Sequence, residues 1–353
     1  HSVVVINASE GEPLSSKDRT LLSLRPHLAL DGAALAAETL GADQIVLYLA
    51  KGSKTAERTL RDAMDERASA GLAEAPMRIV TTEHRYIAGE SSAVINRVSG
   101  GLSKPKFTLQ RSAEKGVDDR PTLVQNVETI AHVAMIARYG SDWFRRLGTE
   151  RSPGSALMTV TGNIARPGVY EVDLGASLAG VLAAAGGTVS PPAGALLGGY
   201  FGTWLPAASL RDLPLDAERL RASYGASLGC GVLAILPSGA CGVAESARIV
   251  AYLAAETAGQ CGPCVNGLAA LADTMHRIAV SEAESGDLER VHRWIDMVKG
   301  RGACHHPDGA VGQLASAITA FKDHLWMHTA GQRCRGLEVA GFPRPPASGR
   351  GWR

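Results

Sequence analysis

The sequence lacks the features that mark membrane-spanning, secreted or nucleic-acid-binding proteins. It has no apolar run of about 18 residues or more, so we expect no direct insertion into a membrane. The formal net charge is +1 with 20% charged residues, which gives no electrostatic reason to expect a nucleic-acid partner. We find no secretory signal pattern. The six cysteines are dilute and do not form an even disulfide framework, which predicts a reducing, cytoplasmic location.

An apolar fraction of 45% over 353 residues predicts a globular protein of two or three domains with ample core. The chain begins with His1 rather than Met, so we expect the natural protein to continue upstream. The fold class we expect is α/β, with a helical bundle towards the C-terminus. The predicted domains are an α/β domain over residues 1–150, a second domain over 151–225 and a helical bundle over 226–330. A flexible tail is predicted over 331–353.

Strand and helix patterns alternate in residues 1–150. Strands are predicted at 2–6, 44–49 and 77–81, with helices at 26–40 and 55–70 between them. This order is typical of a parallel, Rossmann-like sheet with right-handed crossovers. Ligands of such sheets bind beyond the carboxyl ends of the strands. The turns 7–12 and 86–92 fall at those ends, so we expect the binding residues there.

The middle part combines short strands with glycine-rich turns. Residues 158–172 fit two strands around an Arg-Pro-Gly turn, 177–185 a short helix, and 196–202 a glycine-rich strand. The pattern resembles the ubiquitin-like β-grasp module named SLBB, for which we expect a docking or spacer role. We expect Cys230 to be a buried small apolar residue in a strand within 226–237. Cys241 and Cys334 have no partner at a metal-ligand spacing, and we expect neither to be a ligand.

Three other cysteines carry the strongest chemical signal. Cys261 and Cys264 flank a Gly-Pro turn, and Cys304 follows 40 residues after Cys264 (304 − 264). Helices predicted at 244–257, 266–280, 288–299 and 311–324 form an up-down bundle, whose antiparallel hairpin returns Cys304 to the end that holds the other two thiols. Such a set suits an iron–sulfur cluster or a soft metal, although zinc sites and redox dithiols also use Cys-x-x-Cys.

Several motifs in order resemble one family. The turn 7–13, Asn-Ala-Ser-Glu-Gly-Glu-Pro, is similar to N-A-D-E-x-E-P, and 86–93 is similar to Y-I-C-G-E-E-T-A. Residues 104–107 resemble K-P-P-F, 121–129 resemble P-T-x-x-N-N-V-E-T, and 256–267 resemble the cluster loop E-S-C-G-x-C-x-P-C-R-x-G. These are motifs of the NADH-binding FMN and iron–sulfur flavoprotein subunit of respiratory complex I and of related NAD-linked dehydrogenases and hydrogenases. The family's glycine-rich flavin-phosphate loop has no counterpart after His1, and we expect it upstream.

The resemblance implies FMN, a [4Fe-4S] cluster and NAD(H) as substrate. The implied cofactor-binding residues are Asn7, Ser9, Glu10, Glu12, Tyr86, Gly89, Glu90, Ser91, Lys104, Phe107, Gln125, Asn126 and Thr129. A flavin ring needs donors, acceptors and a close-approaching glycine, which this set supplies. Asn and Glu at strand ends are also common turn formers and helix caps. We expect Glu12, Lys104 and Phe107 to form the NADH pocket, with Phe107 stacking on adenine.

The chain departs from the family at Ser9, Ser91 and Ala258. Ala258 replaces the first cluster ligand, so the implied iron ligands are Cys261, Cys264 and Cys304, with His305 or His306 as candidates for the fourth. The resulting function is that of an NADH dehydrogenase-like electron-transfer subunit. Its expected partner is a thioredoxin-like [2Fe-2S] subunit or a ferredoxin-type acceptor. The alternatives are a scaffold subunit that has lost its chemistry and a zinc-binding interaction module.

Overall fold

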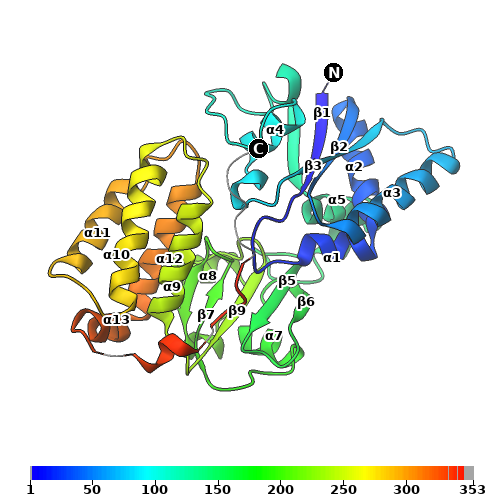
Figure 1. The fold of residues 1–353 in the computed structure, drawn as a ribbon. Helices are drawn as coiled ribbons and strands as arrows, with labels where there is room; N and C mark the ends of the chain where they lie inside the picture. The colour runs from blue at the N-terminus through cyan, green and yellow to red at the C-terminus, as the bar shows by residue number, and fades with distance from the viewer. Residues whose placement is uncertain (1, 333, 340, 346–353) are drawn as a thin grey trace. The chain divides into compact units, whose positions relative to one another are not determined.

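The computed structural model describes residues 2–332, 334–339 and 341–345 (Figure 1). Their backbone forms two compact units. Residues 2–11 and 16–146 make up the first unit, and residues 12–15 and the described residues from 147 onward make up the second. Among the described helices, none combines the length and the apolar character that crossing a bilayer requires.

The first unit is built on a parallel sheet. Its described strands are β1 Ser2–Ala8, β2 Ala42–Ala50, β3 Met77–Thr82 and β4 Thr122–Asn126, in the order β3-β2-β1-β4. The central strand β1 pairs in parallel with both β2 and β4. Because side chains alternate along a strand, Val4 and Ile6 enter one core layer and Val3 and Val5 the other. This is the parallel sheet that the sequence predicts.

Helices cover both faces of this sheet. They are α1 Lys17–Leu24, α2 Pro26–Leu40, α3 Lys54–Ser69, α4 Ser91–Val98, α5 Val127–Tyr139 and α6 Ser141–Phe144, with 3-10 turns at Tyr86–Gly89 and Val117–Asp119. Leu22, Leu30 and Leu60 share a core with Val4, whereas Val94 and Val98 of α4 pack with Val3. The helix α2 ends as predicted at Gly41, whose left-handed backbone (φ 57°) lets its N–H close the last turn.

The second unit begins with a mixed sheet in the order β6-β5-β9-β7-β8. The strands are β5 Ser155–Gly162, β6 Gly168–Asp173, β7 Pro192–Leu197, β8 Thr203–Pro206 and β9 Val232–Pro237, with helices α7 Leu178–Ala184 and α8 Ala217–Tyr224 and a 3-10 turn at Ala207–Leu210. The central strand β9 runs parallel to β5 and antiparallel to β7. The boundary expected between residues 225 and 226 is therefore misplaced, because it would separate β9 from its sheet.

A helical bundle completes the second unit (Figure 1). Its elements are α9 Gly242–Ala255, a π-helical turn Pro263–Leu268, α10 Ala269–Ala279, α11 Asp287–Val298, α12 His306–Ala320 and α13 Lys322–Thr329. The first four α-helices correspond to the predicted bundle, and α13 is additional. The bundle packs on the sheet through α12, where Oγ of Ser316 accepts the N–H of Trp204 in β8 (3.0 Å).

The described part of the expected flexible tail is packed. A 3-10 turn spans Arg335–Glu338, and both Cys334 and Phe342 are buried. The ring of Phe342 stacks on Trp204 at a centroid distance of 5.5 Å and an interplanar angle of 14°. Burial of an aromatic ring outweighs the Pro- and Gly-rich composition on which the expectation rested. Residues 346–353 lie outside the described residues.

The crossing of α2 and α5 yields a stability prediction. A Cβ added at Gly32 of α2 would overlap the carbonyl oxygen of Ile130 in α5, whereas a Cβ at the exposed Gly312 of α12 meets no atom within 4 Å. We expect Gly32→Ala to lower the free energy of unfolding by about 1–3 kcal/mol through overpacking. The matched Gly312→Ala should raise it by up to about 1 kcal/mol, because alanine favours helix. Urea denaturation of both variants measures the free energy of unfolding. An unchanged free energy of unfolding in Gly32→Ala would contradict the close crossing of α2 and α5.

Candidate functional site

Polar side chains meet at the carboxyl ends of β1 and β4. Asn7 and Asn126 are partners across these strands, and Nδ2 of Asn126 donates to the main-chain oxygen of Asn7 (3.4 Å). Nδ2 of Asn7 donates to the carbonyl of Gly89 (2.8 Å), and its Oδ1 accepts from Oγ of Ser9 (2.8 Å). Four of the residues predicted to bind cofactor thus form one connected group at the sheet edge where ligands of parallel sheets bind.

The main chain between Tyr86 and Gly89 lies close against this group. A Cβ at Gly89 would come within 2.7 Å of Oγ of Ser9, and one at Gly11 within 2.7 Å of the carbonyl of Arg85. Only glycine permits this approach, so the two predicted turns pack closely against each other through their main chains. The side-chain amides of Asn7 and Asn126 at this edge are donors and acceptors of the kind that a flavin ring requires.

Two of the three acidic residues of these turns, Glu10 and Glu90, accept hydrogen bonds at helix starts. Oε1 and Oε2 of Glu10 accept the main-chain N–H groups of Asp18 (3.0 Å) and Arg19 (3.2 Å) in the first turn of α1. Oε2 of Glu90 accepts the N–H groups of Ser92 (2.9 Å) and Ala93 (3.1 Å) in α4. Both carboxylates meet the positive end of a helix dipole. The contacts of both carboxylates are therefore those of helix caps. They fix the positions of the turns to which a ligand would bind.

A buried ion group lies directly behind the sheet edge. Nζ of Lys17 is 2.6 Å from Asp18 and 2.7 Å from Glu128, and it donates to Oδ1 of Asn126 (3.2 Å). Burial lowers the pKa of Lys17, but the two carboxylates outweigh burial and hold that pKa above its usual range. Lys17, Asp18 and Glu128 were not predicted as site residues, although Glu128 lies within the motif 121–129.

The remaining predicted residues of the first unit surround this edge more loosely. Gln125, Thr129 and Ser91 are exposed, Tyr86 and Lys104 are half-buried, and the side chain of Phe107 is 71% exposed. The loop that carries Lys104 and Phe107 is held beside α4, because Oγ of Ser92 accepts the N–H of Lys106 (3.1 Å). These side chains are at least partly accessible to a solute.

Glu12 has a different task from the one predicted. It belongs to the second unit, where it is buried. Its Oε2 accepts the main-chain N–H of Tyr200 (2.8 Å), and its Oε1 accepts that of Leu14 (3.2 Å). A buried carboxylate is stabilised by such hydrogen bonds. The carboxylate therefore organises the turn after β7.

The three predicted cluster cysteines come together at one end of the bundle. Cys264 is buried in the π-helical turn that precedes α10, a type of turn often found at functional sites. Burial raises the pKa of the Cys264 thiol to about 12, and the nearby thiols of Cys261 and Cys304 contribute to this rise. The antiparallel return of the chain thus brings Cys304 back as predicted.

The spacing of these thiols argues against a single ion. The sulfur atoms of Cys261, Cys264 and Cys304 are not among the described donor atoms found to lie within 4.8 Å of one another in groups of three or more. A single tetrahedral ion with bonds of about 2.3 Å to sulfur requires sulfur atoms within about 4 Å of one another. A cluster of several irons accepts wider spacing, so the donor set fits a [4Fe-4S] cluster at three corners better than it fits zinc.

The predicted fourth ligand is not in place. Ala258 is buried at the position of the family's first ligand. The side chain of His305 is 96% exposed and lies 4.0 Å from Asp308, so it does not line a buried site. The side chain of His306 is buried, and its Nε2–H donates to the carbonyl of Leu253 (2.8 Å), which leaves the lone pair of the ring on Nδ1. The expectation for His305 is therefore corrected, because the chain enters α12 with this side chain facing solvent.

Cys230 also differs from its prediction. It lies in the turn before β9 rather than in the strand, and it is only half-buried. Its Sγ is 3.1 Å from the carbonyl of Gly198. A Cβ at Gly199 would come within 2.6 Å of both this sulfur and Oε2 of Glu12, so the thiol helps to fill the turn that Glu12 organises.

The buried ion group gives a prediction with two readouts. Lys17→Met leaves the buried carboxylates of Asp18 and Glu128 without that cation, and we expect it to lower the free energy of unfolding by about 3–5 kcal/mol at pH 8. The loss should shrink at pH 5, because carboxylates without a cation take up protons at higher pH than usual. Denaturant titration at both pH values measures it. The control is Lys115→Met, which alters an exposed pair with Asp119 at the opposite edge. Equal losses in the two variants would contradict the role of Lys17.

Three family models match the chain. The model described as the Nuo51 FMN-binding domain matches residues 1–135, and the SLBB domain matches residues 157–197. The NADH-ubiquinone oxidoreductase-F iron-sulfur binding region matches residues 244–328. The first match contains the strand-edge group, and the last contains all three cluster cysteines.

Whole-chain comparisons agree with these matches. The NADH-quinone oxidoreductase F 2 subunit of Rhizobium meliloti (strain 1021) is 31% identical over 340 residues, which are 93% of this chain and 80% of the relative. The corresponding F subunit of Streptomyces coelicolor (strain ATCC BAA-471 / A3(2) / M145) is 30% identical over 99% of this chain and 78% of the relative. A crystal structure of NAD+-reducing [NiFe]-hydrogenase in the H2-reduced state superposes with a TM-score of 0.86 at 31% identity, covering 94% of this chain but 57% of the hydrogenase chain. The chain belongs to the family of NADH-quinone oxidoreductase F subunits and is an NADH dehydrogenase-like oxidoreductase subunit with FMN-binding and iron–sulfur regions, as its motifs predict.

Proposed function

We propose that this chain passes electrons from NADH to a partner protein, with FMN held at the carboxyl edge of the first sheet and a [4Fe-4S] cluster held by Cys261, Cys264 and Cys304. The observation that carries the proposal is the joint presence of both donor sets: the group around Asn7 and the three converging thiols. When bound, FMN exchanges electrons in pairs or singly and so couples a two-electron donor to a one-electron acceptor.

The residues of the first unit would position the ring rather than react with it. Asn7 and Asn126 are locked by hydrogen bonds to neighbouring main chain, so their orientation is fixed before a ligand arrives. Gly89 leaves room for close approach of the main chain, and Ser9 fills the place beside it. Lys17 forms ion pairs with Asp18 and Glu128 behind this group and donates to Oδ1 of Asn126, which holds that side chain in position.

The nicotinamide donor would bind over the exposed side of this edge. Phe107 offers a largely exposed aromatic ring, and Lys104 offers a cation on the same loop. Ser91, the exposed first residue of α4, leaves this approach without the acidic side chain that the family motif has there. We propose that NADH is retained chiefly through the Lys104 loop.

In the helical bundle, the thiols of Cys261, Cys264 and Cys304 would bind three irons of the cluster. The fourth iron would bind a ligand other than these three cysteines. Cys264 lies deepest, while Cys261 and Cys304 are half-buried. The acceptor proposed is a thioredoxin-like [2Fe-2S] subunit or a ferredoxin-type protein, acting in the cytoplasm. Membership of a family whose members are parts of larger complexes supports the existence of partner subunits.

The donor assignment is tested with NADH and an artificial acceptor. We expect Lys104→Ala to raise the KM for NADH about tenfold with a smaller effect on kcat, because a contact to a charged group is lost from the ground state. Lys115→Ala, which removes an exposed lysine from the opposite edge, should leave KM unchanged. The assay uses full-length protein purified without oxygen, with bound flavin, iron and zinc quantified. Absence of flavin and iron would favour the scaffold alternative, and zinc on the three cysteines would favour the interaction module.

The cluster assignment is tested by restoring a thiol. Ala258→Cys should slow the oxidative loss of iron and the appearance of a [3Fe-4S] EPR signal, because the fourth iron gains a thiolate. The matched Ala255→Cys adds an exposed thiol at the end of α9 and should change neither. Anaerobic iron and sulfide analysis with EPR measures both. A cluster that persists in Cys264→Ser would overturn the assignment.

A further inference from the structure

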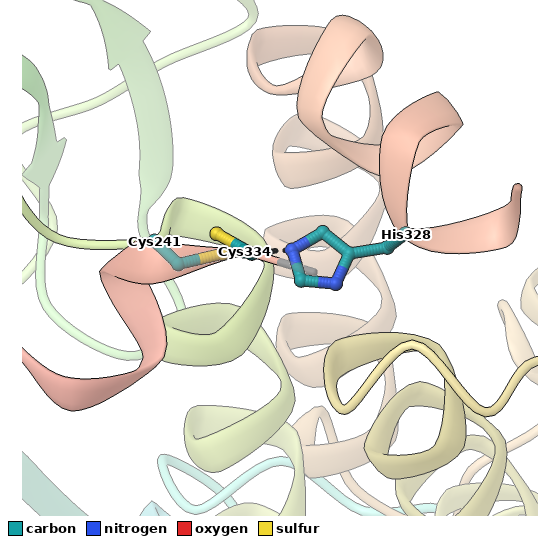
Figure 2. Close-up of side chains that lie close together, drawn as sticks. All are labelled: Cys241, His328 and Cys334. Carbon is teal, nitrogen blue, oxygen red and sulfur yellow. Dashed lines mark hydrogen bonds between the residues drawn. The ribbon is translucent and has the colours of Figure 1, made fainter. Parts of the chain in front are cut away.

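A second group of soft donors lies away from the proposed cluster ligands. Cys241, His328 and Cys334 each offer one donor atom, and these atoms all lie within 4.8 Å of one another. Figure 2 shows the two sulfur atoms and the imidazole ring pointing toward a common centre. The three side chains come from the start of α9, the end of α13 and the segment after α13, so the group closes a loop of 93 residues (334 − 241).

All three residues are buried. Cys241 is 2% exposed, Cys334 is 8% exposed and His328 is 0% exposed. The sequence assigned no role to either cysteine, because a spacing this long resembles no ligand motif. Free cysteines are common in cores. Two thiols and an imidazole that share one buried centre are a ligand set typical of zinc.

The hydrogen bonds of His328 leave the correct nitrogen facing the sulfurs. Oγ of Ser281 donates its proton to the carbonyl of Gln332 (2.8 Å), and it lies 3.2 Å from Nδ1 of His328. Since a hydroxyl has one proton, it accepts from Nδ1–H, and this places the lone pair on Nε2. Nε2 lies 3.2 Å from Sγ of Cys241. A histidine oriented through its second nitrogen is the arrangement that metal sites use.

Main-chain contacts hold the segment around Cys334 against the start of α9, in addition to the contacts between the three side chains. The N–H of Cys241 donates to the carbonyl of Gly336 (3.2 Å), and a Cβ at Gly336 would come within 2.8 Å of that nitrogen. The turn that follows Cys334 is therefore pressed against the start of α9. Sγ of Cys241 also accepts the N–H of Ala244 (3.4 Å), which fixes the sulfur at the start of α9, while burial holds the pKa of this thiol above its usual range.

We propose that Cys241, His328 and Cys334 form a zinc site that fastens the segment after α13 to the start of α9. The donor separations suit bonds of about 2.3 Å to sulfur and about 2.0 Å to nitrogen. Binding of Zn2+ releases the two thiol protons, and the fourth position is left to water. Soft thiolates select zinc over magnesium or calcium. The site keeps Phe342 against Trp204 by holding the chain eight residues earlier (342 − 334).

The test measures zinc in the full-length chain expressed with added zinc and purified without oxygen. We expect about one zinc per chain by plasma mass spectrometry. Zinc K-edge absorption, which iron does not obscure, should report two sulfur ligands and at least one imidazole. Cys241→Ser and Cys334→Ser should each lose most of the zinc. The matched Cys230→Ser removes a half-buried thiol outside the group and should retain it.

Three results would overturn the proposal. They are wild-type protein without zinc, zinc unchanged in the two serine variants, and a Cys241–Cys334 disulfide in the anaerobic protein. The absorption edge of the wild type decides the ligand set even if a variant fails to fold, and circular dichroism identifies such a variant. Zinc held instead by Cys261, Cys264 and Cys304 would survive Cys241→Ser, so failure of this site is distinct from failure of the proposed electron-transfer function.

Discussion

The buried ammonium of Lys17 is the interaction on which the first unit depends most. It forms ion pairs with Asp18 in α1 and Glu128 in α5 and donates to Oδ1 of Asn126 at the end of β4. Without a cation there, two carboxylates would share a dry space, which is costly. Because Asn126 also contacts β1, the same charge fixes the polar groups at the sheet edge. The same ion pairs thus stabilise the first unit and position the side chains at its sheet edge. A ligand therefore meets side chains whose positions are already fixed.

In the second unit, the two cysteine groups form because the chain reverses direction between helices, so that residues distant in sequence meet. Each helix returns the backbone to an end of the bundle, so cysteines far apart in sequence become neighbours. Thiols meet at one group around Cys264 and at another around Cys241. The two groups differ in spacing, and that difference separates a multi-iron cluster from a single ion. Burial alone does not distinguish them, because Cys264 and Cys241 are both almost fully covered.

Local signals made much of the fold predictable. The helix Pro26–Leu40 is recovered to the residue, because Pro at its start and Gly41 at its end act through their own backbone angles. The helix α1 and the strand β4 were not predicted, since their short apolar patterns gain meaning only by packing on β1. The local surroundings of Asn7 and Cys261 follow from contiguous motifs and could be predicted from the sequence. Those of Glu12, His305 and Cys334 could not, because they depend on residues distant in sequence.

The central place of β9 has a consequence for synthesis of the chain. This strand comes last in its sheet, yet it lies between β5 and β7. Until residue 237 has left the ribosome, β5 and β7 have no shared neighbour and expose unpaired N–H and C=O groups, which are the groups that promote association between chains. The β-grasp sheet therefore cannot close during the translation of its first four strands. Its completion waits for the segment that leads directly into α9, so the iron–sulfur bundle begins to emerge only as the sheet beneath it becomes whole.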